Sequence, residues 1–174
     1  MTLGYTTMGN GAEKVLVFHG WTSDHTVWQP IFPALDTQTF TYVFPDYRGY
    51  GKSRHLTGQY TMREIAADMI ALVDQLGWRR FHMIGQSMGA MAMQRLLVDI
   101  DDLLRVKSAV AITPVPACGA QLDQDSWSTF EASVSDDNSR YLITDFTTGK
   151  RLPSAWIRAM VQKSRETTTE SAYY

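Results

Sequence analysis

The pentapeptide Gly-Gln-Ser-Met-Gly at residues 85–89 constrains the fold of this chain of 174 residues more than any other segment. It follows a short apolar run at residues 81–84, which predicts a buried strand, and precedes residues 90–98, which are rich in helix formers. A strand that turns at once into a helix holds the residue between them, Ser87, in a strained backbone conformation. The pattern therefore predicts a strand, a sharp turn and a helix, with the Ser87 hydroxyl projecting above the edge of a sheet.

This turn makes Ser87 a candidate nucleophile. Gly85 and Gly89 flank it because side chains there would obstruct so tight a path. The first free N–H groups of the new helix, beginning with that of Met88, point toward whatever Ser87 attacks and are suited to stabilise an oxyanion. The alternative is an ordinary glycine-bounded turn, since the pattern also recurs by chance. The strand before it and the helix after it favour the nucleophile.

A second segment of interest lies upstream, where the apolar run at residues 15–18 ends at His19-Gly20-Trp21. Gly20 allows the backbone to approach a ligand closely, and the Trp21 N–H is placed to be the second oxyanion donor. His19 has two interpretations, a catalytic base or a structural histidine that holds the loop in place. We favour the structural one because His19 precedes the nucleophile on the oxyanion side.

A third apolar strand, beginning at residue 42, runs into a glycine-punctuated loop that ends at Ser53. We expect Asp46 and Arg48 to satisfy backbone groups of this loop or to pair with each other. Residues 49–53, Gly-Tyr-Gly-Lys-Ser, superficially match a phosphate-binding loop. That motif needs four residues between its glycines and only one is present, which argues against nucleotide binding.

Taken in this order, residues 19–21, 46–53 and 85–89 resemble the N-terminal half of an α/β-hydrolase, over roughly residues 3–116. The pattern is similar to that of bacterial esterases, perhydrolases and carbon–carbon bond hydrolases, which carry H-G-x on the oxyanion loop and S-M-G at the nucleophile elbow. Haloalkane dehalogenases and epoxide hydrolases share the layout but use an aspartate nucleophile, so Ser87 argues against both. The resemblance implies an α/β fold, with a mostly parallel sheet and helices on both faces, incomplete at the C-terminus.

The remaining pattern agrees with this layout, because predicted strands alternate with predicted helices. Thr61 and Glu64 form a capping box that opens a helix ended by Gly77. Residues 108–113 predict the next strand, stopped by the prolines that follow. The apolar stripe of the capped helix consists of Ile65, Met69, Leu72 and Leu76.

The pattern changes after residue 116, so we divide the chain into a hydrolase core at residues 1–116 and the start of a cap or lid at residues 117–174. We expect polar, irregular chain from residue 117, and then an amphipathic helix from about Pro153. Apolar residues of that helix recur at four-residue spacing, and we expect them to pack against the core rather than to touch substrate. They are Trp156 with Met160, and Ile157 with Val161.

The catalytic triad of the family runs serine, acid, histidine, and no histidine occurs after Ser87 in this chain. The resemblance therefore implies that the acid and the histidine come from sequence not present here. The chain is an N-terminal piece of a longer or cleaved protein, or a truncated product whose open sheet edge is covered by a partner or a second copy. A third explanation uses an upstream histidine as base. The best placed is His25, for which a solvated loop histidine is the favoured interpretation.

The resulting functional hypothesis is a serine hydrolase that transfers an acyl group from a small apolar carboxylic ester to Ser87. The alternatives are a carbon–carbon bond or lactone hydrolase with the same nucleophile, and a non-catalytic fragment or binding module. Trp21, Trp28 and Met88 suggest an apolar substrate site, with core packing as the alternative for each. Without a general base, we expect residues 1–174 alone to be nearly inactive.

Composition limits the partners. The net charge of −2 gives no electrostatic case for nucleic acid, and no apolar run approaches the length of a membrane-spanning helix. The N-terminus lacks a basic and apolar signal segment, so we expect a cytoplasmic protein. Cys118 is the single cysteine and cannot form an internal disulfide. The scattered histidines show no metal-binding spacing, and we expect neither a metal nor a cofactor.

Overall fold

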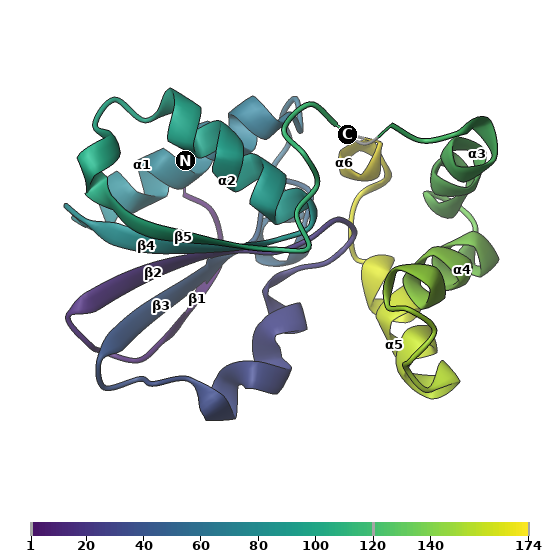
Figure 1. Cartoon of the computed structure of the whole chain (residues 1–174), viewed down its shortest axis with the longest axis horizontal. Helices are drawn as coiled ribbons and strands as arrows, with labels where there is room; N and C mark the ends of the chain where they lie inside the picture. The colour runs from purple at the N-terminus through teal and green to yellow at the C-terminus, as the bar shows by residue number, and fades with distance from the viewer. Residues whose placement is uncertain (1, 120, 174) are drawn as a thin grey trace.

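The computed structural model describes residues 2–119 and 121–173, and its core is a five-stranded sheet with the strand order β1-β3-β2-β4-β5 (Figure 1). β1 pairs antiparallel with β3, and every other neighbouring pair is parallel. The prediction of a mostly parallel sheet is therefore confirmed. The strands are β1 (Tyr5–Met8), β2 (Glu13–Phe18), β3 (Phe40–Pro45), β4 (Phe81–Gln86) and β5 (Val106–Ile112).

Helices cover the two faces of the sheet unequally. α1 (Met62–Gln75) and α2 (Met88–Asp99) pack on one face, and the 3-10 segment η1 (His25–Ala34) lies on the other (Figure 1). Two shorter 3-10 segments are η2 (Gly51–Ser53) and η3 (Leu103–Arg105). Among the described residues, no helix is both long enough and apolar enough to cross a membrane.

The segment after residue 116, which we continue to call the cap, lies beyond the carboxyl ends of the parallel strands (Figure 1). Its helices are α3 (Gln124–Ser133), α4 (Asp137–Thr147), α5 (Ser154–Ser164) and α6 (Thr169–Ala172). The expectation of irregular chain from residue 117 is wrong for α3 and α4. Asp123 and Asp136 accept hydrogen bonds from the backbone N–H groups of Ser126 and Ser139, so each acts as the N-cap of one of these helices.

The predicted helices begin where the sequence indicates. Thr61 Oγ1 accepts from the Glu64 N–H at 3.2 Å at the start of α1, but the Glu64 carboxylate accepts from Tyr60 N–H rather than closing the box on Thr61. α5 starts at Ser154, after Pro153. Of its two apolar pairs only one is in the interior: Ile157 and Val161 are buried, whereas the side chain of Trp156 is 52% exposed.

Buried side chains form two clusters, one on each face of the sheet. The larger one lies under α1 and α2 and includes Phe18, Met69 and Met83. The smaller one includes Trp28 of η1 together with Val17 and side chains of β3. β2 contributes to both clusters because it runs through the middle of the sheet, where both faces are covered.

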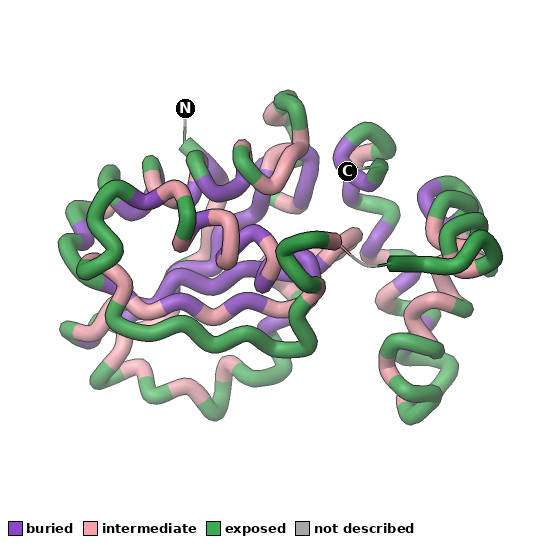
Figure 2. The backbone as a smooth tube through the Cα atoms, turned by 45° about the horizontal axis from the view of Figure 1, so that its top comes forward, coloured by how far each residue is buried: buried purple, intermediate pink, exposed green. Residues whose placement is uncertain are grey.

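β5 is the exception to this burial. It forms one edge of the sheet and is exposed along nearly all its length (Figure 2). Val110 is 51% exposed and Ile112 is 39% exposed. An exposed apolar edge strand offers unpaired N–H and C=O groups to another chain, and such edges favour association.

We therefore expect residues 1–174 to self-associate as concentration rises, and Val110→Lys to reduce that association because a charged edge residue opposes strand pairing. Sedimentation velocity over a concentration series measures the effect. Val98→Lys is the matched control, since Val98 is 74% exposed on α2, away from the strand. Equal association of the wild type and Val110→Lys would contradict this interpretation.

Candidate active site

Ser87 connects β4 directly to α2 and has backbone angles of φ 54° and ψ −121°, a conformation that non-glycine residues rarely adopt. Its N–H donates to the Ile112 carbonyl at 3.0 Å, at the end of β5. Its carbonyl accepts from the Ala90 N–H at 3.0 Å and from the Val115 N–H at 3.4 Å. Hydrogen bonds on both sides therefore hold the strained turn that the sequence predicts.

Glycines around the turn allow three backbone segments to approach closely. A Cβ at Gly89 would lie 2.4 Å from the His19 carbonyl oxygen, and one at Gly85 would lie 2.8 Å from the Ala90 Cα. A Cβ at Gly20 would meet Gln86 Oε1 at 2.3 Å. All three distances are shorter than van der Waals contact. The elbow and the loop after β2 are thus packed against each other, backbone on backbone at Gly89 and through the Gln86 side chain at Gly20.

Two backbone donors near the elbow remain free. Within residues 2–119 and 121–173, neither the Trp21 N–H nor the Met88 N–H donates a hydrogen bond. Met88 is the first residue of α2, so its N–H lies at the positive end of the helix dipole. These are the two groups that the sequence analysis assigns to an oxyanion hole.

The three side chains expected to line a substrate site lie in different places. Trp21 is half-buried at the boundary between core and cap, where its indole N–H donates to the Ala172 carbonyl at 2.9 Å and its ring lies 5.7 Å from that of Phe130. Met88 is buried in the core under α1. Trp28 is buried in the cluster on the opposite face of the sheet. The substrate-binding assignment is therefore wrong for the side chain of Trp28. For Met88 it stays a prediction, because this side chain also lines a small pocket with Tyr47 and Tyr50.

His19 is fully buried inside the loop region. The Gly20 carbonyl, 2.9 Å away, can only accept, so His19 Nδ1 donates to it and Nε2 accepts from the Tyr47 N–H at 3.4 Å. The ring stacks on Tyr47 at a centroid distance of 3.9 Å, and the Tyr47 hydroxyl donates to the His19 carbonyl. Both ring nitrogens are occupied by loop contacts, which leaves neither to take a proton from Ser87.

Asp46 organises the next loop and satisfies backbone groups, which is one of the two expectations for it. Its fully buried carboxylate accepts from the backbone N–H groups of His25 and Lys52, at 2.7 and 2.8 Å, and lies 2.8 Å from His25 Nδ1. The interpretation of His25 as a solvated histidine is therefore wrong, since only 12% of its side chain is exposed. Arg48 does not pair with Asp46. It forms a bidentate ion pair with Asp68 on α1.

Asp24, His25 and Asp46 place three potential metal ligands within 4.8 Å of one another. Asp24 already accepts from the Thr26 N–H and pairs with Lys163 at 3.1 Å. Since the two carboxylates are occupied by N–H groups and a lysine, internal hydrogen bonds account for the cluster. Sequence reasoning missed it because its members come from separate loops that only the fold brings together.

A serine held in a strained strand-to-helix turn at the carboxyl edge of a mostly parallel sheet, with free N–H groups near it, is the backbone geometry of the elbow in α/β-hydrolase folds. The chain belongs to the alpha/beta hydrolase fold family, whose model matches residues 14–151.

Relatives of several activities match parts of the chain. It is 29% identical to a pimeloyl-[acyl-carrier protein] methyl ester esterase of Vibrio atlanticus, over 84% of this chain and 54% of that protein. It is 35% identical to a soluble epoxide hydrolase of Corynebacterium, over 58% of this chain and 34% of that protein. A hydrolase structure from Oleispira antarctica superposes with a TM-score of 0.83 at 18% identity, covering 98% of this chain and 66% of that one.

The chain thus spans between about a third and about a half of the length of these two curated relatives. The solved structure likewise extends well beyond the matched part. Nothing in the described residues after Ser87 supplies a histidine.

Gly89→Ala tests the close approach at the elbow. We expect it to lower the free energy of unfolding by about 3 kcal/mol, the upper end of the usual cost of overpacking, because the new Cβ collides with backbone. Gly77→Ala is the control: Gly77 has φ 69° but nothing within 4 Å of its added Cβ, so only the left-handed backbone cost of about 1 kcal/mol applies. Urea unfolding measures both, and equal costs would contradict the packing argument.

The pH dependence of stability tests the buried His19. Burial lowers the pKa of His19 below its ordinary value, against the opposing charges of Asp46 and Asp24. The unfolded chain therefore takes up a proton near pH 6.5 that the folded protein does not. The free energy of unfolding falls as the pH drops below about 6.5, by at most about 1.4 kcal/mol per pH unit for this group.

Urea midpoints at pH 7.5, 6.5 and 5.5 measure this effect. We expect His19→Gln to lessen the loss of stability on acidification, and His55→Gln, at an exposed histidine, to leave it unchanged. Wild-type stability that stays constant or rises over this interval would show that His19 is not held neutral.

Proposed function

We propose that this chain supplies the nucleophilic half of a serine hydrolase that acts on small apolar carboxylic esters. The Ser87 hydroxyl attacks the ester carbonyl carbon, and the Trp21 and Met88 N–H groups hold the oxyanion that forms. The alcohol leaves with a proton, and water then attacks the acyl-enzyme to release the acid. The observation that carries the proposal is the strained conformation of Ser87 beside two free N–H donors.

The strain at Ser87 also argues against a non-catalytic binding module, the alternative from another class. Such a conformation costs about 1 to 3 kcal/mol and persists only where the surrounding structure enforces it. Here two hydrogen bonds and the glycine contacts enforce it. A binding module has no evident need for such a turn.

The general base of the proposed reaction lies outside residues 1–174. His19 is occupied on both ring nitrogens. His25 is bonded to Asp46 through Nδ1, and within the described residues no hydrogen bond joins it to Ser87. We infer that the acid and the histidine come from sequence after residue 174 or from another polypeptide, and that the open β5 edge receives that part or a second copy. The greater length of the relatives supports this inference.

The choice of substrate depends on the nucleophile and on the relatives. Serine rather than aspartate at position 87 favours acyl transfer over epoxide or haloalkane opening, and the esterase match extends over more of this chain than the epoxide hydrolase match does. A carbon–carbon or lactone substrate with the same nucleophile is the second candidate. One solved relative is an N-acyl homoserine lactonase, with a TM-score of 0.76 at 15% identity.

Hydrolysis of p-nitrophenyl acetate by purified residues 1–174 tests whether this part of the protein lacks the general base. We expect a residual acceleration over water of no more than about 10³- to 10⁴-fold, because donors and binding remain while the base is missing. Ser87→Ala should leave this residual rate nearly unchanged, because the donors and the binding surface remain. A rate typical of complete serine esterases would contradict the missing base.

Labelling by a serine-reactive phosphonate in the complete protein tests the nucleophile: we expect Ser87→Ala to lose the label and Ser23→Ala, a serine of the loop after β2, to keep it, and a label that Ser87→Ala retains would contradict the assignment.

The mass of the native protein under denaturing conditions tests the origin of the base. We expect a parent chain, or an accompanying polypeptide, of about one hundred further residues, as the size of single α/β domains suggests. A single species of 19.7 kDa would contradict this origin of the base and would indicate an inactive fragment or a binding module.

A further inference from the structure

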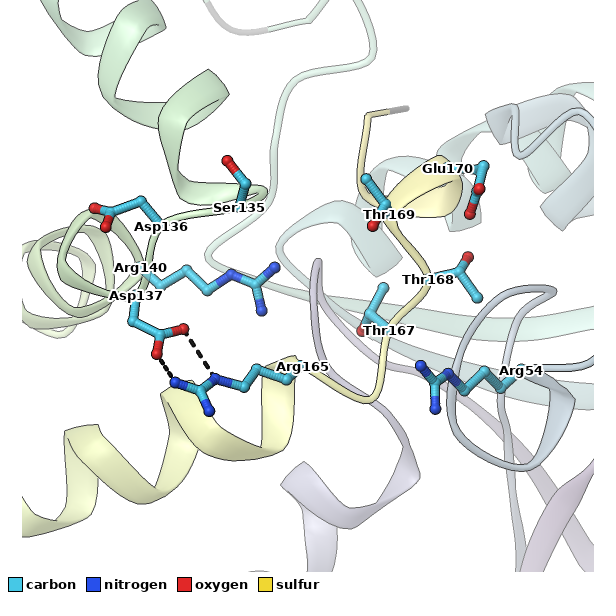
Figure 3. Close-up of a pocket in the computed structure, with 10 residues that line it drawn as sticks. All are labelled: Arg54, Ser135, Asp136, Asp137, Arg140, Arg165, Thr167, Thr168, Thr169 and Glu170. Atoms are coloured by element: carbon cyan, nitrogen blue, oxygen red, sulfur yellow. Dashed lines mark hydrogen bonds and ion pairs between the residues drawn. The ribbon is translucent and has the colours of Figure 1, made fainter.

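A polar hollow of about 650 Å³ lies between the core and the cap, and no residue of the elbow or of residues 19–21 lines it. Its walls come from the loop after η2, the start of α4, the end of α5 and the segment that leads into α6 (Figure 3). The proposed hydrolase chemistry makes no use of it. The charged groups that face it are therefore unexplained by that chemistry.

Arg140 enters the hollow from α4. Its guanidinium donates to the carbonyls of Ser133 and Val134 and to Ser164 Oγ, all of which are neutral. Among the residues that the structure describes, no carboxylate lies within ion-pair distance of it. Burial lowers the pKa of Arg140, since the partly desolvated cation has no counter-charge. Part of its donor capacity remains free.

Arg54 faces the hollow from the opposite wall, and its guanidinium points inward (Figure 3). Its side chain makes no hydrogen bond or ion pair within the described part of the chain. Thr167 lies on the segment between the two walls and is only 8% exposed. In that same part of the chain its hydroxyl has no hydrogen-bond partner, although it lines the hollow. The hydroxyl therefore faces the open hollow, where it is available to a ligand.

Three carboxylates also line the hollow and balance its three arginines, so the distribution of charge matters more than its sum. Asp137 is paired with Arg165, whose Nε lies 3.0 Å from Asp137 Oδ1. Asp136 caps α4 through the N–H and hydroxyl of Ser139, both at 2.7 Å. Glu170 is exposed in the first turn of α6. The two guanidinium groups left without carboxylate partners are those of Arg54 and Arg140.

We propose that this hollow binds a small oxyanion, the phosphate or carboxylate group of a ligand, through the guanidinium groups of Arg54 and Arg140 and the hydroxyl of Thr167. Guanidinium groups match the geometry of both anions and form charge-assisted hydrogen bonds to them. The walls belong to both core and cap, so a bound anion links the two. The proposal is independent of the reaction at Ser87.

Isothermal titration of residues 1–174 with inorganic phosphate, and separately with acetate, tests the proposal at an ionic strength held constant with sodium chloride. We expect saturable binding of at least one anion, with a dissociation constant below about 10 mM. Losing one charge-assisted contact weakens binding by about tenfold or more, so Arg54→Gln should raise the dissociation constant by that factor. Comparison of the two titrations shows which anion the hollow prefers.

Two further variants complete the test. Thr167→Val keeps the shape of the side chain and should weaken binding without unfolding the cap, whereas Arg140→Gln also removes the hydrogen bonds that hold the turn before α4. Arg151→Gln is the matched control, since Arg151 is an exposed cap arginine outside the hollow. Wild-type protein that binds neither anion overturns the proposal, and so does binding that Arg54→Gln and Thr167→Val leave unchanged.

Discussion

The close approach of the end of β2 to the start of α2 is the contact on which the rest of the site depends. Gly89 lies against the His19 carbonyl with no room for a side chain. Because Trp21 follows two residues after His19, and Ser87 precedes Gly89 by two, this single contact sets the nucleophile and the proposed oxyanion donors relative to each other. The backbone strain at Ser87, of about 1 to 3 kcal/mol, is borne by this packing and by the hydrogen bond to β5.

Next to this contact, buried polar groups hold the loops that follow β2 and β3 in place. Tyr47 stacks on His19 and bonds its carbonyl, and Asp46 accepts backbone N–H groups from two different loops. A fully buried carboxylate is stable only when such donors surround it. The loops at the carboxyl edge therefore form one connected layer under the site.

The cap is joined to this layer at its C-terminal segment. The Tyr50 hydroxyl donates to the Ser171 carbonyl at 3.0 Å, the Thr168 N–H donates to the Gly49 carbonyl at 2.9 Å, and the Trp21 indole donates to Ala172. Trp21 thus provides a backbone group to the proposed site and a side-chain contact to the cap. Movement of the cap would therefore displace the loop that follows β2, through the Trp21 side chain.

Local patterns predicted the parts of the structure that depend on local physics. The elbow followed from glycine spacing between a strand and a helix, and α1 from its cap and apolar stripe. The pairing of His25 with Asp46 was not predictable, because it joins residues 21 positions apart through the register of the sheet. The assignment of Trp28 to the substrate site was wrong because the sequence near a loop does not show which face of the sheet an aromatic side chain covers.

α3 and α4 were missed for a different reason. Aspartate and serine favour both loops and helix N-caps, so composition alone does not separate the two. Asp123 and Asp136 begin these helices, and three of their large apolar side chains, Trp127, Leu142 and Phe146, are exposed rather than gathered on a buried face.

Amide hydrogen exchange at Ser87, Met88 and Trp21, followed by NMR on residues 1–174, tests the central claim most directly. The account predicts strong protection of the Ser87 N–H, which is bonded to Ile112, and fast exchange of the Met88 and Trp21 N–H groups, which are free to bind an oxyanion. An unprotected Ser87 amide, or protection of the other two equal to it, would contradict the claim that this chain by itself assembles the elbow with its donors exposed.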